Sequence, residues 1–250
     1  MRESEQALSL ELDGDSETLL IAFGGMNQRI GIPPFEFFAA AGDIPVKRVF
    51  VRDLNQAWYH RGVPGGGTDL MSVHELLAAI VAGQPVTRLV TAGGSAGGYA
   101  ALVFGTLLGA DTVLSFSPQS ILDLDELARM GDHRWDDHLR PLVAREELDV
   151  RWADLATALP PARRAGTRYE VFCDESLRTD WLHVERIAHV PGLRVYRFGR
   201  GSHSLIRELR DRGALNTILR RALQAPDGGP PGGEAIAPAA PAPDGGGRRA

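Results

Sequence analysis

The sequence predicts an α/β fold with a mostly parallel central sheet and helices on both of its faces. Short apolar segments of strand-like composition alternate along the chain with longer segments whose apolar residues recur at helical spacing. The later short segments are almost continuously hydrophobic, which is typical of strands buried on both faces of a parallel sheet. The length of 250 residues suffices for one full-sized domain of this class.

Seven short segments are expected to form strands. The first two, 7–13 and 18–24, flank the turn-forming sequence DGDSE and are expected to pair as a hairpin. The apolar runs that follow are expected to form the buried strands: 46–53, 88–93, 112–117, 168–173 and 193–199.

Helical periodicity appears most clearly in three longer segments. In the first of them, Leu70, Val73 and Leu77 fall on one side of a helix, and Gly83 is expected to end it. The three expected helices are 68–83, 180–190 and 204–223. Strands that alternate with helices in this order predict crossover connections between parallel neighbours.

The chain divides into a folded part and a tail of different composition. Residues 1–224 are expected to form one domain, in which the long connection 121–166 has no clear strand and forms a small helical insertion over the site. Residues 225–250 are almost all Gly, Pro and Ala. Such a segment buries too little apolar surface to offset the entropy of ordering it, so we predict a disordered tail.

Charge and composition argue against several kinds of partner. The formal net charge is −5 with acidic and basic residues mixed along the chain, which argues against nucleic acid as the main partner. No apolar segment approaches the length of a membrane span, and the first residues show no signal-peptide pattern. The single cysteine, Cys173, is expected to be a small buried hydrophobic residue. We expect a cytoplasmic protein without nucleic-acid or membrane partners; the oligomeric state stays open.

Glycine is concentrated where one predicted strand meets a helix. The sequence from Gly93 to Gly97, GGSAG, matches the G-x-S-x-G pattern, in which a serine sits on a sharp strand-to-helix turn. The flanking glycines let the turn close, and the helix N-terminus points N–H groups at a developing oxyanion. A phosphate-binding loop also lies between strand and helix, but the sequence matches neither a Walker A loop nor G-x-G-x-x-G. The pattern predicts Ser95 as a nucleophile.

A serine nucleophile requires a general base, and His203 is the expected one. It lies in the loop FGRGSHSL, between the last predicted strand and the last predicted helix, where a rigid scaffold can hold an exposed side chain. His133 and His138 lie close to aspartates, but an exposed polar face is expected there rather than a metal site. The histidines within helical patterns are expected at the surface or in packing: His74, His183 and His189.

The base requires an acid that orients it, and three acidic residues follow the strand predicted at 168–173. Asp174 follows the strand directly, Glu175 comes next, and Asp180 precedes an apolar helical pattern that it could equally cap. The chain order serine, acid, histidine is that of one large fold family.

These features resemble the α/β-hydrolases from about Thr18 to Leu223. The chain is similar to a bacterial group of serine hydrolases that carries the same short motifs in the same order: Gly24-Gly25, Arg52-Asp53, Trp58-Tyr59, the GGSAGGYAAL elbow at Gly93–Leu102, and FSPQ at Phe116–Gln119.

The same resemblance implies which carboxylate is the acid. In that group an aspartate stands three residues before the histidine of an H-x-E-R-I/L-A helix, and the sequence HVERIA beginning at His183 matches it. The resemblance therefore implies Asp180 in preference to Asp174. The glycine-x-x-aspartate acid motif common among α/β-hydrolases does not occur at this position, which is a departure from the pattern of that superfamily.

The resemblance implies cleavage of an ester or thioester in a small-molecule acyl substrate, without a cofactor or metal. The expected oxyanion donors are the backbone N–H of Ala96 and that of Gly25 or Met26 in the loop after the first core strand. The same residues would also serve an acyltransferase. A non-catalytic binding module on a hydrolase scaffold is the alternative from another class.

Trp58, Tyr59 and His60 give the loop after the strand predicted at 46–53 a polar and aromatic character. The residues suit an acyl or alcohol pocket, and they equally suit packing against the sheet. We expect Trp58 and Tyr59 to line the substrate pocket.

Overall fold

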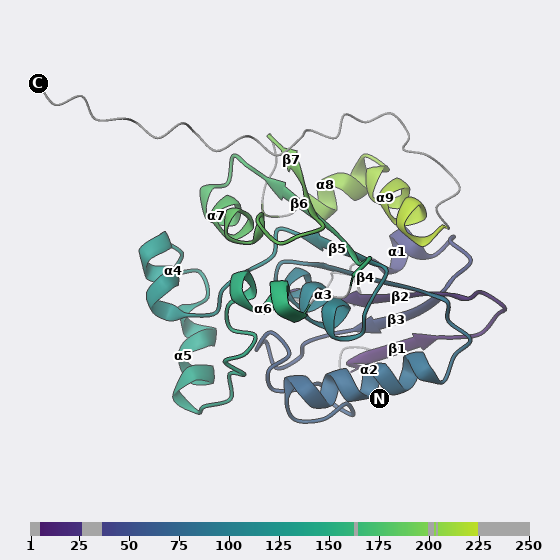
Figure 1. Ribbon diagram of the computed structural model, residues 1–250, viewed down its shortest axis with the longest axis horizontal. Coiled ribbons are helices and arrows are strands. Elements are labelled where there is room, and N and C mark those ends of the chain that lie inside the picture. Colours follow the sequence, from purple (N-terminus) through teal and green to yellow (C-terminus); the bar gives the residue numbers. More distant parts are fainter. Residues whose placement is uncertain (1–5, 27–36, 163–164, 200–202, 204, 225–250) are drawn as a thin grey trace, which may run out of the picture.

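The computed structural model describes residues 6–26, 37–162, 165–199, 203 and 205–224. The strands of this part of the chain are β1 (Leu8–Glu11), β2 (Thr18–Phe23), β3 (Lys47–Val51), β4 (Arg88–Gly94), β5 (Thr112–Phe116), β6 (Arg168–Asp174) and β7 (Leu193–Phe198). They form one sheet in the order β1-β3-β2-β4-β5-β6-β7 (Figure 1). Every neighbouring pair is parallel except β1 with β3. This sheet confirms the predicted α/β fold class.

The predicted hairpin between the first two strands is wrong. β1 pairs antiparallel with β3, with Leu8 opposite Val51, whereas β2 lies between β3 and β4. Because both edges of β2 are occupied by parallel neighbours, the free edge of β3 is the place left for β1. The turn sequence is instead tied to β3 by the Lys47 ammonium group, which donates to the Gly14 carbonyl oxygen.

Helices cover both faces of the sheet. The helices of the described chain are α1 (Phe38–Ala41), α2 (Leu70–Ala82), α3 (Ala96–Leu107), α4 (Leu124–Met130), α5 (Asp136–Ala144), α6 (Leu155–Ala162), α7 (Arg178–Ile187), α8 (Leu205–Asp211) and α9 (Ala214–Leu223). One core lies between a sheet face and α1, α8 and α9, and a second core joins the opposite face to α2, α3, α6 and α7 (Figure 1). Consecutive strand residues such as Leu20 and Ile21 enter opposite cores, because the side chains of a strand point alternately to its two faces.

Two of the predicted helices differ from the observed ones in detail. The segment predicted as one helix over 204–223 is broken into α8 and α9 at Gly213, whose φ of +72° is incompatible with a continuous helix. α7 begins at Arg178, with Leu177 at the N-cap position. Asp180 therefore lies inside the first turn of this helix and is not its cap.

The connection from β5 to β6 contains α4, α5 and α6, which lie within the predicted insertion 121–166. Figure 1 shows α4 and α5 at one side of the layers, and their Leu127, Leu139 and Leu142 extend the second core. Within the described ranges, no helix combines the length and apolar character needed to cross a membrane. The predicted tail, 225–250, lies outside the described residues.

The parallel strands bring the residues of the candidate site together at one edge of the sheet. In a parallel sheet the carboxyl ends of the strands lie at one edge, and ligands bind there. Segments that follow five of these strands carry the residues of the candidate site: Gly25 after β2, Ser95 after β4, Gln119 after β5, Asp180 after β6 and His203 after β7.

Candidate active site

Ser95 occupies a strained turn between β4 and α3. Its φ of +55° and ψ of −120° lie in a region that a side-chain-bearing residue rarely adopts. A Cβ on Gly93 would clash with the carbonyl oxygen of Gly97, and a Cβ on Gly97 would clash with the carbonyl oxygen of Phe23. The two glycines of the G-x-S-x-G pattern are therefore required by close backbone approach, and the turn projects Ser95 toward the carboxyl edge of the sheet.

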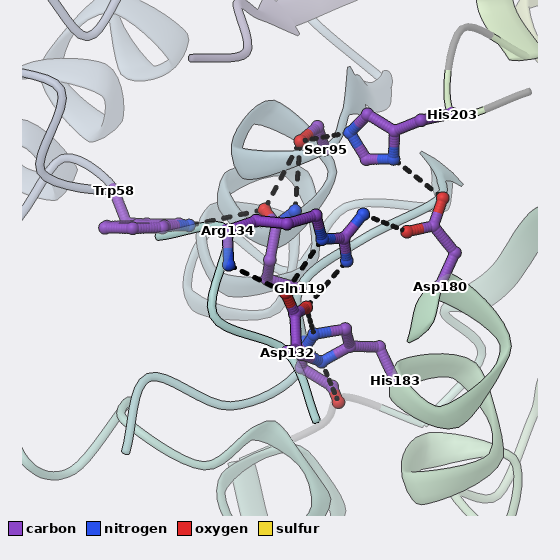
Figure 2. A network of polar contacts seen from close by, with 9 residues as sticks. Trp58, Ser95, Gln119, Asp132, Arg134, Asp180, His183 and His203 are labelled. Atoms are coloured by element: carbon purple, nitrogen blue, oxygen red, sulfur yellow. Dashed lines mark hydrogen bonds and ion pairs between the residues drawn. The ribbon is translucent and has the colours of Figure 1, made fainter. Parts of the chain in front are cut away.

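Ser95, His203 and Asp180 form a continuous chain of hydrogen bonds (Figure 2). The Ser95 hydroxyl lies 3.1 Å from Nε2 of His203, and Nδ1 of His203 lies 2.7 Å from Oδ2 of Asp180. A carboxylate can only accept, so Nδ1 carries a hydrogen and Nε2 is free to accept the serine proton. The Asp180 side chain is 1% exposed, whereas the His203 side chain is 36% exposed.

The competing carboxylates lie elsewhere. Oδ1 of Asp174 accepts hydrogen bonds from the backbone N–H of Ser176 at 2.8 Å and from its hydroxyl at 2.6 Å. Glu175 lies 3.7 Å from Nη1 of Arg197. Asp174 thus stabilises the turn after β6, while Asp180, in the first turn of α7, contacts His203.

Arg134, from the loop between α4 and α5, holds the second oxygen of the Asp180 carboxylate. Its Nη1 lies 2.6 Å from Oδ1 of Asp180, and the rest of the guanidinium binds both oxygens of Asp132 at 2.6 and 2.8 Å. Burial raises the pKa of Asp180, but hydrogen bonds and charges of His203 and Arg134 outweigh burial and hold the pKa below its ordinary value of 3.8. Asp180 is therefore ionised at neutral pH and fixed through both oxygens.

His183 extends this network of polar contacts beyond Asp132. It was expected at the surface or in packing, and it is fully buried. Its Nδ1 accepts from the backbone N–H of Ser120 at 3.1 Å, so its Nε2 carries the hydrogen that points to Oδ2 of Asp132 at 3.2 Å. His183 therefore anchors Asp132, which in turn orients Arg134 toward Asp180 (Figure 2).

Gly25, Met26 and Ala96 are the residues predicted to supply oxyanion donors; Gly25 and Ala96 lie beside Ser95, and Met26 follows Gly25 in the chain. Ala96 begins α3, and the first N–H groups of a helix have no acceptor within the helix. A Cβ built on Gly25 would lie 3.0 Å from the Gly94 carbonyl oxygen and 3.7 Å from Cβ of Ser95. The backbone of Gly25 thus lies directly beside the serine, and Gly25 and Met26 are both half-buried.

Trp58 and Tyr59 are both fully buried, but they differ in their relation to Ser95. The Tyr59 hydroxyl donates to the carbonyl oxygen of Gly24 at 2.9 Å, and its ring packs edge-to-face on Phe23. Tyr59 is therefore part of the core behind the site. Trp58 donates from Nε1 to Oε1 of Gln119 at 3.3 Å, and Gln119 contacts the Ser95 hydroxyl.

His60 is also buried and belongs to a structural network. Its Nε2 lies 2.8 Å from the Tyr99 hydroxyl, and its Nδ1 accepts from the backbone N–H of Asp149. Burial lowers the pKa of His60 to about 4, so the ring is neutral at neutral pH. His60 thus joins Tyr99 of α3 to Asp149 of the insertion and does not contact Ser95 in the part of the chain that the structure describes.

Neither a protein-family model nor a curated protein matches the sequence. Solved structures do. Capsule O-acetyltransferase of Neisseria meningitidis serogroup A aligns with a TM-score of 0.62 and 13% identity over 85% of this chain and 90% of its own. S-formylglutathione hydrolase of Staphylococcus aureus aligns with a TM-score of 0.55 and 15% identity over 81% and 83%. An alpha/beta hydrolase enzyme from the sediment metagenome of the Mar Chica lagoon, Morocco, aligns with a TM-score of 0.53 and 15% identity over 86% of this chain and 92% of its own.

The chain has the α/β-hydrolase fold. Ser95 lies at the turn from β4 to α3, Asp180 follows β6 and His203 follows β7, so the three residues occur in the chain order serine, acid, histidine. The identities are too low to transfer an activity from any of these structures.

Four other histidines of the described chain take no part in the contacts of Ser95, His203 and Asp180. His133 and His189 are exposed, and His74 and His138 are partly buried. In the part of the chain that the structure describes, no cluster of His, Cys, Asp and Glu could hold a metal ion. Cys173 is buried in β6, and burial raises its thiol pKa to about 12.

Arg134, Asp132 and Gln119 were not identified from the sequence as parts of the site of this α/β-hydrolase fold. Arg134 and Asp132 come from the insertion, whose path cannot be inferred from periodicity. Gln119 carried a detectable signal, because it closely follows a strand next to that of Ser95 and closes the FSPQ motif.

Replacing Arg134 with Gln is expected to destabilise the protein by about 2 kcal/mol at pH 7, because two buried carboxylates lose a partner that is itself one-third exposed. The pKa values of Asp132 and Asp180 lie below 3.8 in the folded protein, so this stabilisation is present above that pH and lost as the pH falls through the folded values. The difference in melting temperature between wild type and variant should therefore narrow as the pH falls below 3.8.

A matched control is Arg140→Gln, since the Arg140 side chain is 66% exposed and pairs only at the surface with Asp136. The free energy of unfolding of this variant should lie within about 0.5 kcal/mol of the wild-type value. If the difference in melting temperature between Arg134→Gln and wild type is the same at all pH values, loss of ion pairing with the two carboxylates does not cause the destabilisation.

Proposed function

We propose that the protein is a serine hydrolase that cleaves an ester or thioester of a small acyl substrate through a covalent acyl-enzyme. The observation that carries this proposal is the unbroken chain from Ser95 through His203 to Asp180, with distances of 3.1 and 2.7 Å. An activated nucleophile requires a base within hydrogen-bond reach and a third group that orients the base. The strained backbone at Ser95 supports the same role.

In the proposed reaction, Ser95 Oγ attacks the substrate carbonyl carbon while Nε2 of His203 takes the hydroxyl proton. Asp180 stays ionised, holds the imidazole through Nδ1 and stabilises the imidazolium. The N–H groups of Ala96 and of Gly25 or Met26 stabilise the carbonyl oxygen as it becomes negative. His203 then protonates the leaving alcohol or thiol, and water attacks the acyl-enzyme by the same steps in reverse order.

A panel of p-nitrophenyl esters and acyl thioesters, with fluorophosphonate labelling in parallel, tests the proposal. We expect labelling and turnover of at least one short-chain ester, since both require an activated serine. Because one fold neighbour is a capsule O-acetyltransferase, each reaction is repeated with a simple alcohol acceptor. Product partitioning to the acceptor in preference to water would assign acyl transfer. Absence of both labelling and turnover would favour the non-catalytic alternative.

A further inference from the structure

Gln119 lies against Ser95, on the side of β4 that faces β5. Its side-chain Nε2 lies 3.0 Å from Oγ of Ser95, and the residue is 1% exposed (Figure 2). β4, which leads to Ser95, has β2 on one side and β5 on the other. Gly25 follows β2 and Gln119 follows β5, so the two lie on opposite sides of the strand that leads to Ser95.

Trp58 determines which atom of the Gln119 amide faces the serine. The indole Nε1 of Trp58 is a donor only, and it lies 3.3 Å from Oε1 of Gln119. The amide oxygen therefore belongs on the Trp58 side, which leaves the NH₂ group for Ser95. Oε1 is also 3.5 Å from Oγ, but this distance is at the limit for a hydrogen bond and longer than that of Nε2.

The resulting pattern is consistent with the resting site. Ser95 Oγ accepts one hydrogen bond from Gln119 and donates its own hydrogen to Nε2 of His203. Each of these groups then uses its donors and acceptors without conflict. The amide orientation that Trp58 imposes is therefore the one that leaves the serine proton directed at the base.

The loop that carries Trp58 is held rigidly. One oxygen of Asp53 accepts the backbone N–H groups of Ala57 at 2.7 Å and Tyr59 at 3.0 Å. Trp58 and Tyr59 both have positive φ values, +50° and +66°, and Trp135 packs edge-to-face on the Trp58 ring. Strained conformations of this kind persist where the surroundings fix them, and they cluster at functional sites.

We propose, resting on the function proposed above, that Gln119 is a catalytic hydrogen-bond donor to the serine oxygen and that Trp58 is its positioning residue. As the bond to the carbonyl carbon forms, negative charge passes to the carbonyl oxygen; before that, His203 removes the hydroxyl proton and partial negative charge develops on Oγ. The neutral Gln119 amide stabilises that charge and transfers no proton. In deacylation the bond from carbon to Oγ breaks, His203 returns a proton to Oγ, and the same amide N–H stabilises the departing oxygen. Preorganised donors aimed at developing charge act in this way.

Two variants of Gln119 separate a catalytic donor from a packing role. Gln119→Met keeps the length of the side chain and removes the donor, so kcat and the fluorophosphonate labelling rate should each fall about 100-fold. Gln119→Glu is closer in shape but places an acceptor and a negative charge beside the developing alkoxide, so its loss should exceed that of Gln119→Met. Each rate is divided by the concentration of folded protein, which is obtained from the melting curve of that variant. Gln84→Met, in the turn after α2, makes the same substitution outside the site and is the matched control.

A double-mutant cycle tests the role of Trp58. Trp58→Phe keeps an aromatic ring but removes the N–H, which frees the Gln119 amide to rotate and should lower kcat about tenfold. The double variant Trp58→Phe/Gln119→Met should be no slower than Gln119→Met alone, because Trp58 acts through the amide. If the double variant loses the product of the two single-variant reductions in kcat, Trp58 does not act through the Gln119 amide.

The outcomes distinguish this inference from the proposed function. If wild type is labelled and both Gln119 variants react at the wild-type rate, the inference is overturned while the serine mechanism stands. If Gln119→Glu reacts faster than Gln119→Met, a packing role replaces the donor role. If wild type is neither labelled nor active on any ester or thioester, the proposed function and this inference fail together.

Discussion

Replacement of Ser95 by alanine is expected to lower kcat by about 10⁶-fold and to abolish fluorophosphonate labelling. Oγ is the atom that attacks in the proposed mechanism, and the structure offers His203 no other hydroxyl at this distance within the described residues. The melting temperature should stay close to that of wild type, because Ser95 makes no side-chain cap to α3 and the change removes one half-buried hydroxyl.

A matched serine provides the control for this variant. Ser72 forms a capping box with Asp69 at the start of α2, far from the site in the chain. Ser72→Ala should lower stability by about 1 kcal/mol and leave the labelling rate of the folded protein unchanged. Turnover retained by Ser95→Ala would refute the serine mechanism.

Asp180→Asn is expected to lower kcat by about 10⁴-fold, whereas Asp174→Asn should retain most of the activity. The asparagine NH₂ group would face Nδ1 of His203, favour the tautomer with hydrogen on Nε2, and so remove the acceptor for the serine proton. Asp174 accepts hydrogen bonds from Ser176, so its replacement affects the turn after β6 and not the histidine. Pre-steady-state kinetics with a p-nitrophenyl ester measures the acylation rate of each variant.

Melting curves accompany these rates because Asp180 also binds Arg134. It is not the N-cap of α7, so loss of a helix cap does not contribute to the effect. If the two variants exchange outcomes, Asp174 is the acid. If neither variant loses activity, the orienting group is another residue.

The elements that position the catalytic candidates could be predicted because their signals are local. Apolar runs mark β4 through β7, and the glycines around Ser95 mark a turn that only small neighbours allow. The partner of β1 could not be predicted, because a turn signal favours a hairpin and cannot show that both edges of β2 are already occupied. The break at Gly213 was missed because the apolar periodicity continues across it.

The site itself was predictable only in part. Motif context identified Ser95 and His203, and the resemblance to α/β-hydrolases favoured Asp180 over Asp174. Arg134 reaches Asp180 from an insertion whose contacts depend on tertiary packing, and no spacing in the sequence indicates that pairing. The orientation of the Gln119 amide follows from the indole of Trp58, 61 positions away in the chain, and becomes visible only in three dimensions.

The covalent state of Ser95 tests the central proposal most directly. Full-length protein is treated with a fluorophosphonate, digested and mapped by tandem mass spectrometry, with Ser95→Ala treated in parallel. The proposed mechanism predicts one stoichiometric adduct on the peptide that contains Ser95, localised to that residue and absent from the variant. An unmodified Ser95, or an adduct on another residue that persists in Ser95→Ala, would contradict it.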